Sequence, residues 1–371
     1  MRVALVHDWL TGMRGGEKVL EALCEQFPDA DIFTLFHQRG SVSPAIERHR
    51  IDTSFVQWLP FAASQYRRYL PLFPTAVEQF DLDSYDAVIS SSHCVAKGAV
   101  APGRSRHLCY CFSPMRYAWD QFDAYFGPGR TSPAARRWLY RPVMARMARW
   151  DAATAHRVDR FVAISQYVAG RIARYYNRKA TIVYPPVDTS FYHPAEVAPE
   201  GHFLVVSALV PYKRIDLAID AARLAGARLR VVGEGPDRER LMRQAGGSVE
   251  FLGWMSDEAV RDEYRRARAV ILPGEEDFGI VPVEAQACGR PVIAFGRGGA
   301  LETVIDGETG TFFAEASAPA LAGAFERLSR MTLDSARIRR HAEAFSRERH
   351  IRELRDVIDE TVGAPAGGGR W

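Results

Sequence analysis

Two carboxylates, Glu276 and Glu284, bracket a turn that leads from a predicted strand into a predicted helix. The strand ends near Leu272, Pro282 suits the first position of the helix, and Gly289 suits the left-handed residue just past its end. Glu284 then falls in the first helical turn, where the helix dipole favours negative charge. Carboxylates in such a turn are good acceptors for the hydroxyl groups of a sugar or a ribose. A helix-capping acid in a solvated loop is the alternative interpretation.

The backbone between these carboxylates adds hydrogen-bond donors. The N–H groups of Phe278, Gly279 and Ile280 lead into the predicted helix and are aimed at the same cleft. Basic residues follow the strand predicted at residues 203–206. Lys213 in such a loop can neutralise a diphosphate leaving group in a cleft of low dielectric constant, and Arg214 stands beside it. For both basic residues the alternative is a solvated helix start.

Two loops in the first half of the chain are further candidates. Gly15 and Gly16 open a predicted helix after the first strand, and backbone N–H groups at such a point bind anions. Neither the Walker pattern nor Gly-x-Gly-x-x-Gly is present, which disfavours a P-loop enzyme and a dehydrogenase. His93 follows a strand that ends near Ile89, so we expect it at the carboxyl end of a parallel strand. A tight turn and a structural histidine are the alternatives.

Short apolar strands alternate with helical segments along the chain, a pattern typical of parallel sheets covered by helices on both faces. The first series of strands is predicted at residues 2–6, 32–36, 87–89, 108–112 and 160–164, and the second at 203–206, 228–232, 249–252, 269–272 and 291–295. We therefore predict an α/β protein with two doubly wound Rossmann-like domains, residues 1–185 and 201–345, joined by a linker at 186–200. We expect residues 346–371 to form a helix that crosses back to the first domain, with a disordered tail. Ligands bind at the carboxyl ends of such strands, so the site is expected in a cleft that the two domains face.

Composition fits this organisation. The chain has 371 residues, 47% of them hydrophobic and 25% charged, which is an ordinary soluble balance with room for two domains. The net charge of +3 is too small to argue for nucleic acid. The five cysteines are odd in number and form no Cys-x-x-Cys pair, so we expect buried thiols rather than disulfides or structural zinc. An apolar membrane span and a signal peptide are not expected, which favours a cytoplasmic protein.

The segment from Glu276 to Gly289 resembles the signature of the retaining glycosyltransferases of family 4. The resemblance rests on Glu-x7-Glu within Glu-Asp-Phe-Gly, followed by Glu-Ala-x-Ala-x-Gly-x-Pro-Val, and it extends over nearly the whole chain. It implies the GT-B architecture, in which two Rossmann-like domains face a cleft, and a nucleotide-sugar donor. Arg116-Tyr117-x-Trp119-Asp120 resembles a segment of a subgroup that builds bacterial surface polysaccharides, often mannosyltransferases.

This resemblance implies a retaining hexosyltransferase that needs no metal and no cofactor. It places Glu276 and His93 on the transferred sugar and Lys213 on the departing diphosphate. No carboxylate is an obvious covalent nucleophile, so we expect same-face attack in which the departing phosphate oxygen takes the acceptor's proton. GDP-mannose is the expected donor and a UDP-hexose the alternative. The expected acceptor is a polyprenyl-diphosphate-linked glycan or a polysaccharide of the bacterial envelope.

The resemblance also implies a set of donor-binding residues. Glu284 is expected at the ribose, Gly233 near the base, and the glycine loop after the first strand beside the diphosphate. The full set is Gly15, Gly16, Arg214, Gly233, Phe278, Gly279, Ile280 and Glu284. Most relatives have an arginine where this chain has Ala208. Two alternatives stay open: Arg214 supplies the missing charge, or Lys213 and backbone groups hold the diphosphate alone.

Acceptor contacts are expected in the first domain, at Arg116, Tyr117 and Asp120. The segment from Arg130 to Trp150 carries six arginines and contains neither aspartate nor glutamate. Trp138, Tyr140, Met144, Met147 and Trp150 interleave with the arginines. This composition suits an interfacial helix on an anionic membrane, at the inner face of the cytoplasmic membrane. A solvated helix with its tryptophans in the core is the alternative.

Two other function classes remain as alternatives. One is a sugar-nucleotide epimerase of the same fold, which would turn over the donor without an acceptor. The other is a non-catalytic protein that binds a sugar nucleotide or a glycan, which Ala208 favours slightly. The presence of Glu276, Glu284, Lys213 and His93 favours the transferase over both.

Overall fold

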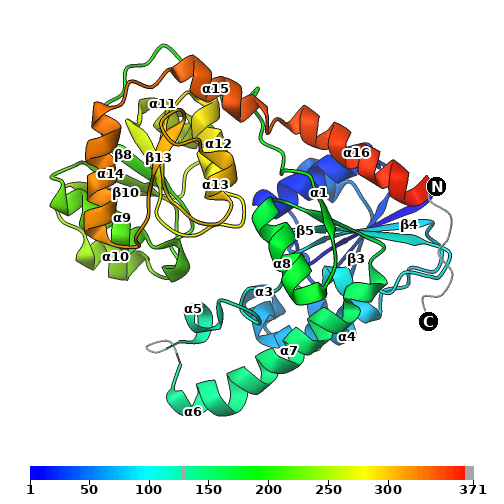
Figure 1. Ribbon diagram of the computed structural model, residues 1–371. Helices are drawn as coiled ribbons and strands as arrows, with labels where there is room; N and C mark the ends of the chain where they lie inside the picture. Colours follow the sequence, from blue (N-terminus) through cyan, green and yellow to red (C-terminus); the bar gives the residue numbers. More distant parts are fainter. Residues whose placement is uncertain (128–130, 364–371) are drawn as a thin grey trace. The chain divides into compact units, whose positions relative to one another are not determined.

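A computed structural model describes residues 1–127 and 131–363, which form two units (Figure 1). The first unit comprises Met1–Pro186 and the chain from His350 onward, and the second comprises Val187–Arg349. Residues 187–200, expected as a linker, thus group with the second unit, where the Val187 N–H donates to the carbonyl of Phe345 at 3.1 Å. The expected disordered tail lies outside the described residues.

The first unit is built on a seven-stranded parallel sheet in the order β3-β2-β1-β4-β5-β6-β7. Its strands are β1 (Val3–His7), β2 (Asp31–Thr34), β3 (Ile51–Thr53), β4 (Ala87–Ser92), β5 (Arg106–Cys111), β6 (Arg160–Ala163) and β7 (Ala180–Ile182). Its α-helices are α1 (Gly15–Gln26), α2 (Pro44–Glu47), α3 (Ala62–Gln65), α4 (Phe73–Glu78), α5 (Phe122–Phe126), α6 (Pro133–Ala135), α7 (Arg141–Ala153), α8 (Gln166–Tyr176) and most of α16 (Arg347–Gly363). In Figure 1, α1 and α16 lie above this sheet and α4 and α7 below it.

The second unit has a six-stranded parallel sheet in the order β10-β9-β8-β11-β12-β13. Its strands are β8 (Phe203–Val206), β9 (Leu229–Val232), β10 (Val249–Gly253), β11 (Ala269–Leu272), β12 (Val292–Phe295) and β13 (Gly310–Phe313). Its helices are α9 (Ile215–Leu224), α10 (Arg238–Gln244), α11 (Asp257–Arg266), α12 (Ile280–Ala287), α13 (Ala300–Thr303), α14 (Ala318–Arg330) and α15 (Ser335–Glu343).

The central strands are buried along their whole length because helices cover both faces of each sheet. All residues of β1, β4, β11 and β12 are buried. The helices present one apolar face to the sheet; in α9, for example, Ile215, Ala218, Ile219 and Ala222 are buried at helical spacing. The five cysteines are buried free thiols, as predicted. No described helix combines the length and apolar character needed to cross a membrane.

Three strands and one helix start differ from the sequence-based expectation. β3, β7 and β13 were not predicted, because each is a short strand at the edge of its sheet. The helix after Gly279 begins at Ile280, two residues before the expected start at Pro282. Gly279 adopts a left-handed conformation (φ 91°) and serves as the N-cap, and proline is tolerated in a first turn whose N–H groups have no helical partner. Glu284 therefore lies in the second turn, and its placement in the first turn was wrong.

Candidate functional site

In each sheet the strand order reverses between two neighbouring central strands, so that successive strands are added toward opposite edges on either side of this pair. These strands are β1 and β4 in the first unit, and β8 and β11 in the second. Loops that leave such a pair at the carboxyl ends diverge, and ligands of open α/β sheets bind where they diverge. The predicted residues follow these strands: Gly15 and Gly16 after β1, His93 after β4, Lys213 and Arg214 after β8, and Glu276 after β11.

Asp8, which the sequence analysis missed, organises the first of these places. It directly follows β1 and is fully buried. Its two carboxylate oxygens accept hydrogen bonds from the backbone N–H groups of residues 93–96, at 2.7 to 2.9 Å. An acidic residue immediately after a buried strand was the available signal. Asp8 thus fixes the loop after β4 that carries His93.

His93 lies against this buried carboxylate. Its Nδ1 is 3.1 Å from Asp8 Oδ2, its ring packs edge-on to Trp9, and 36% of its side chain is exposed. Burial lowers the pKa of His93 below its usual range, and the opposing charge of Asp8 does not reverse this. The imidazole is therefore neutral at pH 7. Because an ionised carboxylate only accepts hydrogen bonds, Nδ1 carries the proton and Nε2 is an acceptor, suited to a sugar hydroxyl.

The glycine pair after β1 forms the first turn of α1, as predicted. A Cβ added at Gly16 would lie 3.4 Å from the Phe112 ring and 3.6 Å from His7, so the helix start packs closely on the strand ends. Glu17, in the same turn, is buried 3.9 Å from His7. Burial raises the pKa of Glu17, but the hydrogen bond and charge of His7 outweigh it and hold that pKa below its usual range.

The predicted acceptor residues divide into two groups. The Tyr117 hydroxyl is 2.8 Å from Cys94 Sγ, and the charge of Arg116 lowers the pKa of His93, so both residues lie close to the His93 loop. Asp120 is instead held by α8, because it accepts a 2.8 Å hydrogen bond from Arg171. The loop after β5 therefore runs from the surroundings of His93 to α8.

Lys213 and Glu276 form an ion pair in the second unit, between the loops that follow β8 and β11. The two side chains are 22% and 11% exposed, respectively, so the pair is accessible but partly shielded from water. The N–H of Gly299, in the loop after β12, donates to the Glu276 carbonyl at 2.8 Å. The loops after β8, β11 and β12 thus converge on this ion pair. The roles predicted for Lys213 and Glu276 in donor binding stay predictions.

Glycines allow these loops to approach one another. A Cβ at Gly274 would lie 2.8 Å from the Tyr212 carbonyl oxygen, next to Lys213. Gly233, predicted near the base of the donor, has a φ of 124°, and its Cβ would lie 2.0 Å from the Ser207 carbonyl oxygen. Neither position accepts a side chain without a backbone shift. Arg214 occupies the left-handed N-cap of α9 (φ 55°) and pairs with Asp216 at 3.2 Å.

The turn before α12 and the helix itself make different contacts. Phe278, in that turn, is buried, and its ring packs on Phe345. Glu284 is buried and accepts a 2.9 Å hydrogen bond from the Tyr264 hydroxyl on α11. Burial and the charge of Glu284 raise the pKa of both Tyr264 and Tyr192. The structure thus places Glu284 beside α11 and does not bring it into the Lys213–Glu276 pair.

The described residues contain no group of three or more His, Cys, Asp or Glu side chains that could hold a metal ion. The groups that the two candidate places bring together are a neutral imidazole beside a buried carboxylate in the first unit and an ammonium–carboxylate pair in the second.

Comparison with known families accounts for both units. The family described as "Glycosyltransferase Family 4" matches residues 13–191, and "Glycosyl transferases group 1" matches residues 191–345. Each of the two matched segments thus corresponds to a glycosyltransferase domain, and the fold of the chain is that of the GT-B architecture. The order of the two parallel sheets and the position of the candidate residues after their central strands agree with this assignment.

Individual relatives of this chain are distant. It is 33% identical to a D-inositol 3-phosphate glycosyltransferase of Geodermatophilus obscurus over 53% of this chain and 51% of the relative. The chain spans about half the length of the curated relatives it matches. The fold resembles the lipopolysaccharide outer core galactosyltransferase WaaB (TM-score 0.67, 17% identity, 97% and 99% coverage). It also resembles Anabaena HepE in complex with UDP-glucose (TM-score 0.70, 17% identity, 97% and 100% coverage).

Proposed function

We propose that this chain transfers a hexose from a nucleotide sugar to a glycan acceptor, with retention of the anomeric configuration and without a metal ion. The observation that carries the proposal is the Lys213–Glu276 ion pair at the β8/β11 position of the group 1 domain. An ammonium there can neutralise a departing diphosphate, and the carboxylate beside it can accept hydroxyl groups of the sugar. Both groups become available to a donor once it separates the pair.

The expected reaction proceeds on one face of the sugar. The bond between the anomeric carbon and the phosphate oxygen breaks, and the acceptor oxygen forms a bond to that carbon from the same side. The departing phosphate oxygen takes the acceptor's proton. Glu276 and the neutral His93 orient the sugar through its hydroxyl groups, and Lys213 balances the charge of the nucleoside diphosphate.

GDP-mannose remains our proposed donor and a UDP-hexose the alternative, which the UDP-glucose complex of HepE supports by analogy. The proposed acceptor is a lipid-linked or polysaccharide glycan of the bacterial envelope. The likeness to WaaB, an enzyme of lipopolysaccharide outer core, supports that acceptor class.

Thermal unfolding with GDP, UDP, ADP, GDP-mannose, UDP-glucose and NAD, without added metal, tests the donor. A ligand at 100 times its Kd stabilises by about 2.7 kcal/mol, so one nucleoside diphosphate and its sugar should raise Tm clearly. Glu284→Gln should reduce this rise, because the amide loses the charge proposed to accept the ribose hydroxyls. Glu239→Gln, on the exposed surface of α10, is the matched control. If no nucleotide raises Tm, the proposed function is contradicted. If nucleotides raise the Tm of Glu284→Gln as much as that of the wild type, only the role of Glu284 is contradicted.

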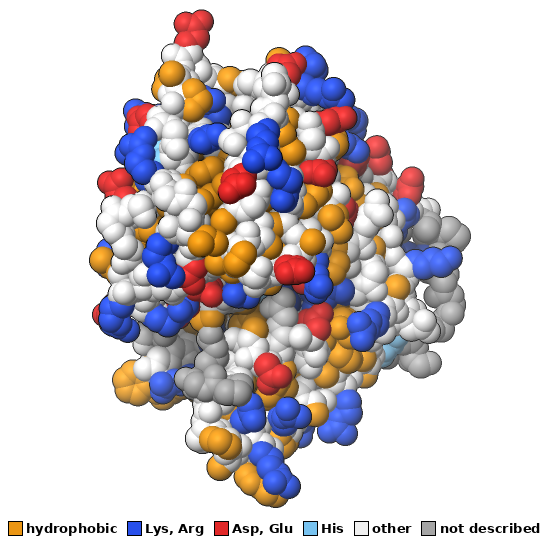
Figure 2. Space-filling model, turned by 60° about the vertical axis from the view of Figure 1, so that its left-hand side comes forward, with side chains coloured by type: hydrophobic (Ala, Val, Ile, Leu, Met, Phe, Trp, Pro, Cys, Tyr) orange, Lys and Arg blue, Asp and Glu red, His pale blue; other side chains and the backbone are white. Residues whose placement is uncertain are grey.

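We also propose that the first unit binds anionic membrane through the surface of α6, the turn at Arg136–Tyr140 and α7. Met144 and Met147 are buried and Trp150 donates a hydrogen bond to Glu78, so these three belong to the core rather than to a lipid face. Arg130 lies outside the described residues. The outward side chains are Arg137, Trp138, Leu139, Arg146 and Arg149, with Trp138 73% exposed. Figure 2 shows basic and hydrophobic side chains together at the lower end, where α6 lies in Figure 1.

Vesicle sedimentation tests this surface. Binding to vesicles with anionic phosphatidylglycerol should exceed binding to neutral phosphatidylcholine and should weaken with salt. The double variant Arg137→Glu/Trp138→Ala should bind at least about tenfold more weakly, because each basic residue near such a surface contributes about 1 kcal/mol. Arg243→Glu, on α10 of the second unit, makes the same charge change at an exposed position and should leave binding unchanged. Equal binding by the double variant contradicts the assignment.

A further inference from the structure

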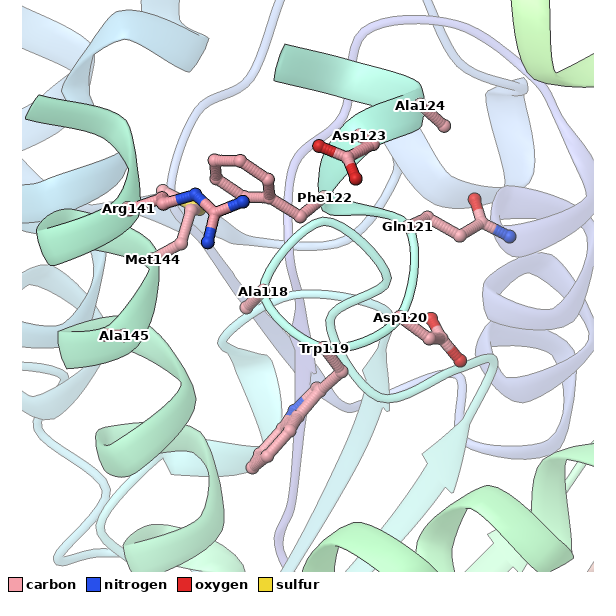
Figure 3. Close-up of a pocket in the computed structure, with 10 residues that line it drawn as sticks. All are labelled: Ala118, Trp119, Asp120, Gln121, Phe122, Asp123, Ala124, Arg141, Met144 and Ala145. Carbon is pink, nitrogen blue, oxygen red and sulfur yellow. The ribbon is translucent and has the colours of Figure 1, made fainter. Parts of the chain in front are cut away.

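A cavity of about 540 Å³ lies within the first unit, beside α5 and the N-terminal half of α7 (Figure 3). This volume falls in the range of small-molecule sites, about 300–1,000 Å³. The lining residues are Ala118, Trp119, Asp120, Gln121, Phe122, Asp123, Ala124, Arg141, Met144 and Ala145. Apart from Asp120, none of them belongs to the acceptor residues expected from the sequence.

The cavity combines a small apolar surface with several hydrogen-bonding side chains. Met144 is buried beneath it, and the guanidinium of Arg141 lies 5.4 Å from the centre of the Phe122 ring. Figure 3 shows Arg141 reaching from α7 toward Phe122, with the Asp123 carboxylate of α5 on the other side of the Phe122 ring. In the part of the chain that the structure describes, neither Arg141 nor the Asp123 carboxylate has an ion-pair partner. Both are therefore available to a ligand.

Gln121 leaves a further group unused. Its Oε1 atom is buried and has no hydrogen-bond donor among the described residues. Figure 3 shows this side chain turned away from Arg141 and Phe122, so a ligand against the Phe122 ring does not contact its amide. Asp120 differs, because Arg171 already holds one of its oxygens and Tyr175 contacts the other.

The charge of the lining selects between ligand classes. Two carboxylates and one guanidinium line the cavity, and this balance disfavours a phosphate or another anion. A neutral polyol suits it, since carboxylates accept hydrogen bonds from neighbouring hydroxyls and a guanidinium donates to them. The aromatic ring and the aliphatic side chains match the apolar C–H face of a pyranose. The lining thus fits an uncharged sugar ring.

The wall of the cavity is fixed to the loop that carries His93. Tyr117, one residue before the lining begins, contacts Cys94, the residue after His93. Trp119 donates a 2.8 Å hydrogen bond to the buried carboxylate of Asp151, which also pairs with Lys97 at 3.0 Å. Lys97 follows the same β4 loop. A ligand in the cavity would therefore be held in a constant position relative to that loop.

We propose that this cavity binds an uncharged sugar residue of the acceptor glycan, through Asp123 and Arg141 and against the Phe122 ring. This inference rests on the proposed transferase function and adds a subsite to it. Such a subsite would select the acceptor by a sugar unit rather than by a phosphate or a lipid chain.

Saturation-transfer NMR on the full chain tests the cavity. The probes are the methyl α-glycosides of glucose, mannose and galactose, together with N-acetylglucosamine and, as the anionic arm, inorganic phosphate. The wild type should bind at least one sugar, and Asp123→Asn and Arg141→Gln should each weaken that binding at least tenfold. Asp29→Asn, an exposed carboxylate in the same unit, is the matched control and should bind like the wild type.

The outcomes separate this inference from the proposed function. Absence of sugar binding, phosphate binding in its place, or unchanged sugar binding by both cavity variants would each overturn the subsite, even where nucleotides raise Tm. Sugar binding that depends on Asp123 and Arg141 supports the subsite, even where no nucleotide raises Tm and the transferase proposal fails. The cavity variants should leave the nucleotide-induced rise in Tm unchanged, because all their contacts lie in the first unit.

Discussion

Replacing Glu276 by Gln is expected to lower kcat/KM for sugar transfer by about 10²–10³-fold, the range for loss of one preorganised polar contact to a transition state. The amide keeps the size of the side chain but removes the charge that meets Lys213 and, in the proposed reaction, the sugar hydroxyls. Nucleotide affinity should be unchanged or higher, because Lys213 no longer has to leave a carboxylate to reach the diphosphate. The measurement is steady-state transfer together with nucleotide Kd from calorimetry.

Glu275→Gln is the matched control, because it removes the same charge from the neighbouring residue of the same loop. Its kcat/KM should stay within a few-fold of the wild type. If both variants retain wild-type transfer, the assignment of Glu276 to the sugar fails. If Glu276→Gln loses nucleotide affinity but keeps its kcat, Glu276 serves donor binding rather than the chemical step.

The fold could be predicted from the sequence because its central strands are buried on both faces. Residues 203–206 and 269–272 are uninterrupted apolar runs between polar segments, and they form β8 and β11 with those bounds. Edge strands give a weaker signal. β3 contains Ile51, Asp52 and Thr53, all partly exposed, and a run of this length and polarity looks like a loop.

The candidate site was predictable where one motif contained the residues, and not where distant segments meet. Glu276 and Lys213 were found from their own loops, but their pairing depends on the order of strands in the sheet. The role of Asp8 depends on β1 and β4 being neighbours in the sheet, because the N–H groups that donate hydrogen bonds to its carboxylate lie 85 to 88 residues away in the sequence. The start of α12 was misplaced because proline is tolerated throughout a first turn, so Pro282 does not mark one position.

Asp8→Asn is expected to lower both stability and transfer. An asparagine would place an NH2 group against N–H donors that now share a fully buried carboxylate. Loss of a buried charge with its partners left in place typically lowers the free energy of unfolding by about 3–5 kcal/mol. Urea unfolding measures this change, and Asp29→Asn, at an exposed position, should be neutral. A fall below about 1 kcal/mol contradicts the structural role of Asp8.

A pH profile separates the effect of Asp8 on His93 from a loss of stability alone. Burial lowers the pKa of His93, and the charge of Asp8 raises it, so removing that charge should lower the pKa further. If transfer needs the neutral imidazole, activity falls as pH decreases through this pKa, and in Asp8→Asn the fall should move to lower pH. His93→Gln cannot titrate and should lose this acid limb altogether. An acid limb that stays in place in Asp8→Asn and persists in His93→Gln would mean that His93 does not govern the reaction, and Asp8 would then act on the fold alone.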